Sequence, residues 1–283
     1  LFYVGITKNI ILSPVSLKDV DPEETFVPTH IDLRNGYLSD MKNWIKRPGY
    51  DDKIYVGVDE PVDLIVPINN GYAVTKNGKI YQNVTATPMQ LTEKSLDGTS
   101  RPTWAFYNGI GVICDGGTPV KVTTDTAVLD GSPPHGKFVD LIDSYIVISG
   151  YNDYGFQWSA AGNIYSWPTA NFNAGIKDGS PIVMHKVLNR ELYFFKRNSI
   201  EVWVNIGGSQ VLARRAVIDV VDKPRAGRGI VGHSVVKANN MFYFYADGDF
   251  VGLQGNGLHV ISNYYRKEID KVLNPDSIFC FDC

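Results

Sequence analysis

The feature that most constrains the fold is the regular alternation of short apolar runs with turns rich in Gly, Asn and Asp. Residues 72–75 and 79–84 flank Asn77-Gly78. Asn-Gly is the strongest short-range signal for a β-hairpin, because both turn positions take positive φ. The same arrangement returns around Asn108-Gly109 and around Asp143-Ser144. The pattern predicts short antiparallel strands joined by tight turns.

The arrangement repeats along the chain. Repeats of about 35 to 50 residues, each with three or four short strands, are typical of β-propeller blades. Runs such as YIVIS, LYFF and FYFY are apolar at consecutive positions, which indicates strands buried on both faces. Stacking similar sheets around an axis covers both faces. We therefore predict an all-β chain that forms a β-propeller of about six antiparallel blades, with inner runs centred near Val74, Val112, Val147, Tyr193 and Tyr243.

The expected boundaries follow from composition. Residues 1–30 are irregular and contain three prolines, so they are expected to form an N-terminal arm or an incomplete blade. Residues 31–283 are expected to form the propeller. The chain ends inside an apolar run, SIFCFDC, which suggests a piece of a longer polypeptide whose propeller is cut short at the C-terminus. A short C-terminal helix is predicted from a cap at Ser262 or Asn263 to Leu273.

Composition narrows the classes of protein. The formal net charge is −3, whereas a free-standing nucleic-acid binder usually needs a cationic excess. No stretch of about 18 apolar residues occurs, so no membrane insertion is expected. Three cysteines, an odd and small number, argue against a disulfide framework and favour a reducing compartment.

No pattern of catalytic or metal-binding residues stands out. Cys280 and Cys283 form a CxxC, but a structural zinc site needs four ligands, so two buried thiols are expected unless further sequence supplies the others. The five histidines are scattered, and structural roles are expected for them. Asp247 and Asp249 lack the spacing of a calcium loop and predict a hairpin turn. We expect no enzyme, metal or cofactor.

One basic stretch is notable, ARRAVIDVVDKPRAGRG. Its functional interpretation is contact with DNA phosphates or with an acidic partner. Its structural interpretation is a solvated loop between blades. Both interpretations remain open for the residues concerned, which are Arg214, Arg215, Lys223, Arg225 and Arg228.

A longer resemblance lies in the second half of the chain. The segment at residues 178–208 reads DGSPIVMHKVLNRELYFFKRNSIEVWVNIGG. A loop follows it, and then the segment VVKANNMFYFYADGDFVGLQGNGLHVISNYYRKEID. From about Gly136 to Lys271 the chain resembles the tail hub, or nozzle, proteins of P22-like short-tailed bacteriophages, the packaged DNA stabilisation proteins. The resemblance consists of strand motifs, and residues before about Lys42 depart from it most.

The resemblance implies a structural virion protein, assembled in the bacterial host cytoplasm and located in the tail. Six copies would form a ring below the head-to-tail adaptor and contact the tail fibre or tailspike and the tail needle proteins. The ring would retain packaged DNA and form part of the ejection channel for the double-stranded genome. A weakly charged wall suits this role, because a cationic tube would grip DNA phosphates at many places.

Two other functions are compatible with the sequence. The aromatic content of 12% and the segment SAAGNIYSW at residues 159–167 favour a propeller glycosidase or carbohydrate-binding module. That segment faintly resembles the Asp-box turn of sialidase-type propellers but lacks its Asp. A scaffold propeller that binds partner peptides on one face is the third possibility.

Overall fold

The computed structural model describes residues 36–38, 44–46, 61–66, 71–82, 89–123, 125–174, 179–208, 211–220 and 229–262. The chain divides into two compact units, one of Gly5–Ile54 and one of Leu1–Val4 with Tyr55–Cys283. In the smaller unit, β1 (Gly36–Leu38) pairs antiparallel with β2 (Trp44–Lys46). The predicted boundary near residue 31 lies outside the described residues.

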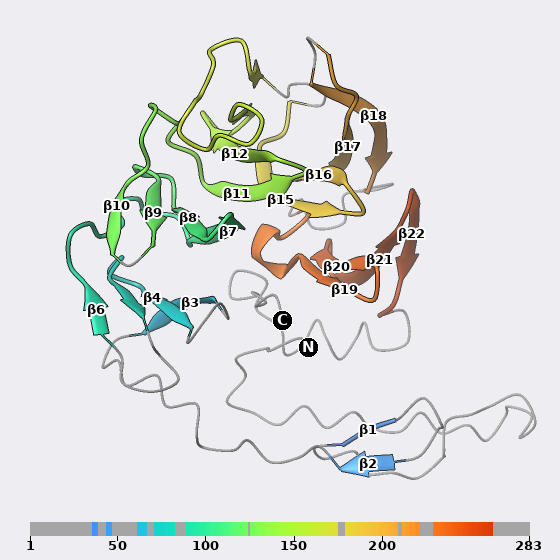
Figure 1. Ribbon diagram of the computed structural model, residues 1–283. Coiled ribbons are helices and arrows are strands. Elements are labelled where there is room, and N and C mark those ends of the chain that lie inside the picture. The colour runs from blue at the N-terminus through green and yellow to red at the C-terminus, as the bar shows by residue number, and fades with distance from the viewer. Residues whose placement is uncertain are drawn as a thin grey trace, which may run out of the picture. The chain divides into compact units, whose positions relative to one another are not determined.

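In the larger unit the described residues form five four-stranded antiparallel sheets, each built from strands that are consecutive in the chain (Figure 1). The first sheet has β3 (Val62–Val66), β4 (Tyr72–Thr75), β5 (Ile80–Gln82) and β6 (Met89–Leu91). The second has β7 (Thr103–Tyr107), β8 (Ile110–Cys114), β9 (Val120–Val122) and β10 (Thr126–Val128). The third has β11 (Phe138–Ile142), β12 (Tyr145–Tyr151), β13 (Gly155–Trp158) and β14 (Phe172–Asn173).

The fourth sheet has β15 (Ile182–Leu188), β16 (Glu191–Lys196), β17 (Ser199–Asn205) and β18 (Leu212–Asp219). A 3₁₀ turn, η1 (Gly232–Ser234), precedes the fifth sheet. That sheet has β19 (Val236–Ala238), β20 (Met241–Ala246), β21 (Asp249–Gln254) and β22 (Gly257–Val260).

The turn between the first and second strands of a sheet repeats in four of the five sheets. Its first residue is always Asn or Asp with φ near 50°, at Asn108, Asp143, Asn189 and Asn239. Short polar side chains tolerate this left-handed conformation best after Gly. The hairpin turns predicted at 108–109, 143–144 and 247–248 are confirmed. The sequence pattern also predicts a turn at Asn256-Gly257. The turn lies one residue earlier, at 255–256, because Gly255 takes the positive φ and β22 begins at Gly257.

Neighbouring sheets share apolar cores. The predicted inner runs are the second strands, and every residue of β16 after Glu191 is buried. One core joins the third, fourth and fifth sheets, a second joins the second and third, and a third joins the first and second. The first strands also meet, since β11 contacts both β7 and β15. Each sheet therefore covers one apolar face of the next, as propeller blades do.

The all-β prediction is confirmed, and the described residues of the larger unit form five four-stranded sheets. The total of about six blades stays a prediction. The predicted helix from 262 or 263 to 273 lies almost wholly outside the described residues, of which only η1 is helical. No described helix is long and apolar enough to cross a membrane.

Candidate functional site

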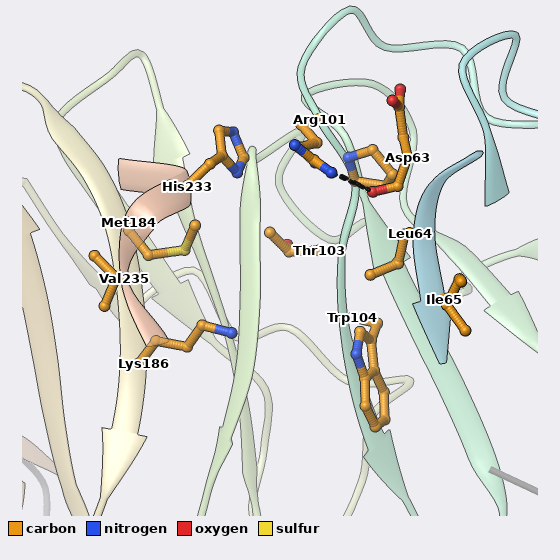
Figure 2. A pocket seen from close by; sticks show the side chains of 11 residues that line it. Asp63, Leu64, Ile65, Arg101, Thr103, Trp104, Met184, Lys186, His233 and Val235 are labelled. Atoms are coloured by element: carbon orange, nitrogen blue, oxygen red, sulfur yellow. Dashed lines mark hydrogen bonds between the residues drawn. The ribbon is translucent and has the colours of Figure 1, made fainter. Parts of the chain in front are cut away.

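A pocket lies where first strands of several sheets converge (Figure 2). Its cavity of about 50 Å³ is lined from β3, β7, β15 and η1, which belong to or precede four different sheets. Strand alternation explains the lining, because Met184 and Lys186 face the pocket on either side of His185. We call it the axial pocket. Side chains from distant parts of the chain, both apolar and charged, line it.

Two cationic side chains and one histidine line the axial pocket. Arg101 donates from Nε and Nη2 to the main-chain oxygen of Asp63, at 3.1 and 3.0 Å. Figure 2 shows Arg101 and His233 at the same end of the pocket and Lys186 pointing inward from β15. Burial lowers the pKa of His233 to about 4, and the positive charges of Arg101 and Lys186 lower it further in the same direction. The imidazole is therefore neutral at pH 7 and can donate and accept hydrogen bonds.

The opposite wall of the axial pocket is apolar. Leu64, Ile65 and Trp104 contribute from the first and second sheets. Ile65 is 38% exposed, so the pocket reaches solvent beside it. Small-ligand sites commonly combine an apolar wall with a few convergent polar groups. The arrangement is suited to binding a small polar ligand.

A half-buried aspartate lies between the third and fourth sheets. Asp140 on β11 accepts hydrogen bonds from the backbone N–H groups of Leu141 and Val187, both at 2.7 Å. Burial raises its pKa, while the positive charges of Lys186 and Lys237 oppose that rise. Asp140 thus ties β11 to β15 and acts electrostatically on one cation of the axial pocket.

A Ser–His contact also joins the third and fourth sheets. Ser149 Oγ and His185 Nδ1 are within hydrogen-bond distance, although 36 residues separate them. Ser149 is fully buried and His185 is 1% exposed. Burial, and secondarily the charge of Lys186, lowers the pKa of His185 to about 3. Because a nucleophile must reach its substrate, this enclosed pair is a packing contact between the two sheets.

Two of the five predicted basic residues lie on β18, the outer strand of the fourth sheet. Arg214 lies 3.5 Å from Glu201 and stacks 6.0 Å from the centre of the Trp203 ring. Arg215 donates to Glu191 Oε2 at 2.9 Å. Both guanidinium groups are therefore held by carboxylates of their own sheet. Contact with DNA stays a prediction for them and for Lys223, Arg225 and Arg228, which lie outside the described residues.

The Glu201 carboxylate belongs to an ion pair that the sequence did not indicate. Lys196 Nζ and Glu201 Oε1 are 2.7 Å apart, and both side chains are 1% exposed. Trp203 Nε1 donates to the other oxygen, Oε2, at 3.1 Å. The run LYFFKRNSIEVWV contains three charged residues, Lys196, Arg197 and Glu201, and two of them form this pair. Charged residues in so apolar a run were the available signal.

The remaining sequence candidates have structural roles where the structure describes them. Asp247 begins the β20–β21 turn and accepts from the Gly229 N–H, as a hairpin turn predicts. Trp167, in the segment compared with an Asp box, packs in the core of the second and third sheets. Within the described residues, no group of three or more His, Cys, Asp or Glu could hold a metal. Cys280 and Cys283 lie outside them.

Comparisons with known proteins concern the fold. No family model matches the sequence, and no curated protein matches it. BamB from Moraxella catarrhalis has a TM-score of 0.45 at 11% identity, over 72% of this chain and 61% of that chain. The extracellular domain of BT4673 from B. thetaiotaomicron has a TM-score of 0.51 at 11% identity, over 72% and 28%. The Cps50 (Swd1) β-propeller domain from Myceliophteria thermophila has a TM-score of 0.46 at 9% identity, over 68% and 70%.

The class that emerges is that of β-propeller-like proteins. Five consecutive four-stranded sheets that share cores with their neighbours define it. The chain spans less than two thirds of BamB and less than a third of the BT4673 domain. At sequence identities near 11%, the similarity concerns the fold and says nothing about an activity.

Proposed function

We propose that this chain is a structural protein of a short-tailed phage tail, a hub or nozzle component. In this role it binds the head-to-tail adaptor, retains packaged DNA and forms part of the ejection channel. The observation that carries the proposal is where the sequence segments that resemble the tail hub family lie in the fold. They fall on the fourth and fifth sheets, which share one aromatic-rich core with the third.

The close packing of that core supports the proposal. Phe195 contacts Phe242 and Phe244 across the boundary between the two sheets, at ring-centroid distances of 5.2 and 5.5 Å. Such aromatic pairs are closely packed and resist shear between neighbouring blades. A wall that guides DNA under pressure needs rigidity of this kind. We further propose that about six blades complete the propeller and that six copies of the chain form the ring.

Charge supports the same role. The net charge of −3 gives a weak long-range field, and six copies would carry about −18. Arg214 and Arg215 lie beside Glu201 and Glu191, and these carboxylates offset part of their positive charge. A duplex can then slide along the wall without being bound at many points.

Assembly on the adaptor tests the proposal. The purified chain is mixed with the head-to-tail adaptor of the same phage and examined by size-exclusion chromatography with light scattering and by electron microscopy. A closed six-fold ring seated on the adaptor is expected. A stable monomer that ignores the adaptor would contradict the proposal.

The basic stretch allows a second, separate measurement. Replacing Lys223, Arg225 and Arg228 by Gln should lower the salt dependence of duplex DNA binding, by a slope of about one per lost phosphate contact. The matched control replaces Lys121 by Gln, which should leave the slope unchanged because that residue pairs with Asp130 and lies outside the basic stretch. Equal slopes in all proteins would assign the stretch to the solvated-loop interpretation.

A further inference from the structure

We propose that Asn108, at the tip of the β7–β8 hairpin, is a site of spontaneous deamidation, and that its isoaspartyl product loosens this hairpin. The inference does not rest on the proposed phage function. It rests on a comparison of the three Asn-Gly pairs within the described residues, which lie in hairpins at 77–78, 108–109 and 256–257. The pairs share the same two residues, so the fold is what makes them different.

The reaction needs only the Asn-Gly pair and water. The backbone nitrogen of Gly109 attacks Cγ of the Asn108 side chain, the Cγ–Nδ2 bond breaks, and ammonia leaves with the proton of that nitrogen. Water then opens the resulting succinimide ring at one of its two carbonyl carbons. Opening at Cγ gives Asp, and opening at the main-chain carbon gives isoaspartate. Gly favours the attack because it has no Cβ to crowd the nitrogen.

The tip of the β7–β8 hairpin leaves the attacking nitrogen accessible. Tyr107 pairs with Ile110, so Asn108 and Gly109 form a two-residue turn, and both turn residues are exposed. A Cβ built on Gly109 would meet no atom within 4 Å. Within the described residues, no backbone hydrogen bond uses the Gly109 N–H. A local rotation of the turn can therefore bring the nitrogen to the side chain, at a lower cost than global unfolding.

The other two pairs are held more firmly. The Gly78 N–H donates to the main-chain oxygen of Thr75 at 2.9 Å. The main-chain oxygen of Leu96 also lies close, since a Cβ built on Gly78 would approach it to 2.5 Å. Gly257 is the first residue of β22, and its pairing with Gln254 closes the β21–β22 hairpin. Attack by either nitrogen must first break a hydrogen bond or a strand pair.

The isoaspartyl product does not fit the turn that Asn108 occupies. It adds one carbon atom to the main chain of a two-residue loop whose ends are fixed by the Tyr107–Ile110 pair. The Asp product does fit, because Asp143 takes φ 52° at the same turn position in the third sheet, close to the 48° of Asn108. Isoaspartate should therefore weaken the pairing of β7 with β8, whereas Asp should leave it intact.

The experiment incubates the full chain in mildly alkaline buffer, with and without denaturing urea, and follows each Asn-Gly peptide by mass spectrometry. In the folded protein, Asn108 should lose its amide at least about fivefold faster than Asn77, the factor expected for one hydrogen bond that protects the competing nitrogen. In urea the three pairs should react at similar rates. This comparison separates the effect of the fold from that of the sequence.

The variant Asn108→Asp is the matched control for the product. It carries the new charge without the isoaspartyl link, so it should unfold at the wild-type urea midpoint. The isoaspartyl fraction, separated by ion exchange and labelled with an isoaspartyl-specific methyltransferase, should unfold at a lower urea concentration. Equal rates at Asn108 and Asn77 in the folded protein, or an isoaspartyl fraction as stable as wild type, would overturn the proposal.

Discussion

The buried ion pair in the fourth sheet makes a sharp prediction about stability. Lys196 and Glu201 are 2.7 Å apart with both side chains 1% exposed, so solvent screens their charges very little. Glu201→Gln removes the negative charge but keeps an oxygen that can accept from Trp203 Nε1. The variant therefore isolates the charge from the hydrogen bond.

The expected cost is large. Removing one partner of a buried pair typically costs about 3–5 kcal/mol, because the other charge stays in a medium that solvates it poorly. For a folded unit of roughly this size, 1 kcal/mol corresponds to a shift of about 2–4 °C in Tm, so a fall of about 10 °C is expected. Urea unfolding followed by circular dichroism measures the free energy, and a thermal scan measures Tm.

The double variant Lys196→Met with Glu201→Gln is the control. Replacing both charges by neutral groups of similar size is often neutral or stabilising, so this protein should recover most of the loss. Arg214, at 35% side-chain exposure, stays hydrated when the carboxylate is gone. The reasoning would be refuted by a loss below about 1 kcal/mol in Glu201→Gln, or by a double variant as unstable as the single one.

Three further predictions concern turns, pH and local opening. Asn240→Gly should stabilise the chain by less than about 1 kcal/mol, because Asn240 has φ 62° and the relief of left-handed strain is partly offset by the greater unfolded-chain entropy of Gly. Gly109→Ala at φ 83° should destabilise the chain, and urea unfolding checks both variants. Because folding lowers the pKa of His185 to about 3, below its ordinary 6.5, its stabilising contribution is complete above pH 6.5 and is lost as pH falls toward 3. Replacing His185 by Gln should therefore flatten the fall in unfolding free energy below pH 6.5, by up to about 1.4 kcal/mol per pH unit, and an unchanged slope would count against the burial argument. In hydrogen exchange, β4 should lose protection before β16, because the core under the first sheet buries only Val, Ile and Leu side chains whereas the core of β16 is rich in Phe; equal protection would contradict this order.

The fold was largely predictable because its signals are local. A turn such as Asn108-Gly109 requires positive φ and specifies it with two adjacent residues. The run 192–195 is apolar at consecutive positions because both faces of β16 are covered by neighbouring sheets. The number of sheets was less predictable, since blades differ in length and a weak repeat can be counted or missed. The one-residue error at Gly255 arose because Gly255 and Gly257 both flank Asn256.

The candidate site was not predictable, and the reason is geometric. Arg101, Lys186 and His233 are separated by 85 and 47 residues, and no local spacing connects them. What brings them together is that each lies on or just before the first strand of a sheet, and first strands converge. Sequence reasoning instead selected Arg214 and Arg215, which are adjacent in the chain but lie on an outer strand and bind their own sheet.

This difference follows from how a propeller-like fold is built. Each sheet contributes its first strand to the shared centre, so a central site receives one or two residues from each repeat rather than a cluster from one. The side chains that face the centre alternate along the strand with side chains that pack between sheets, as Lys186 alternates with His185. A single substitution on a first strand can therefore change the chemistry of the axial pocket while the cores between sheets stay intact. The same substitution on a second strand such as β16, which is buried on both faces, would disturb packing first.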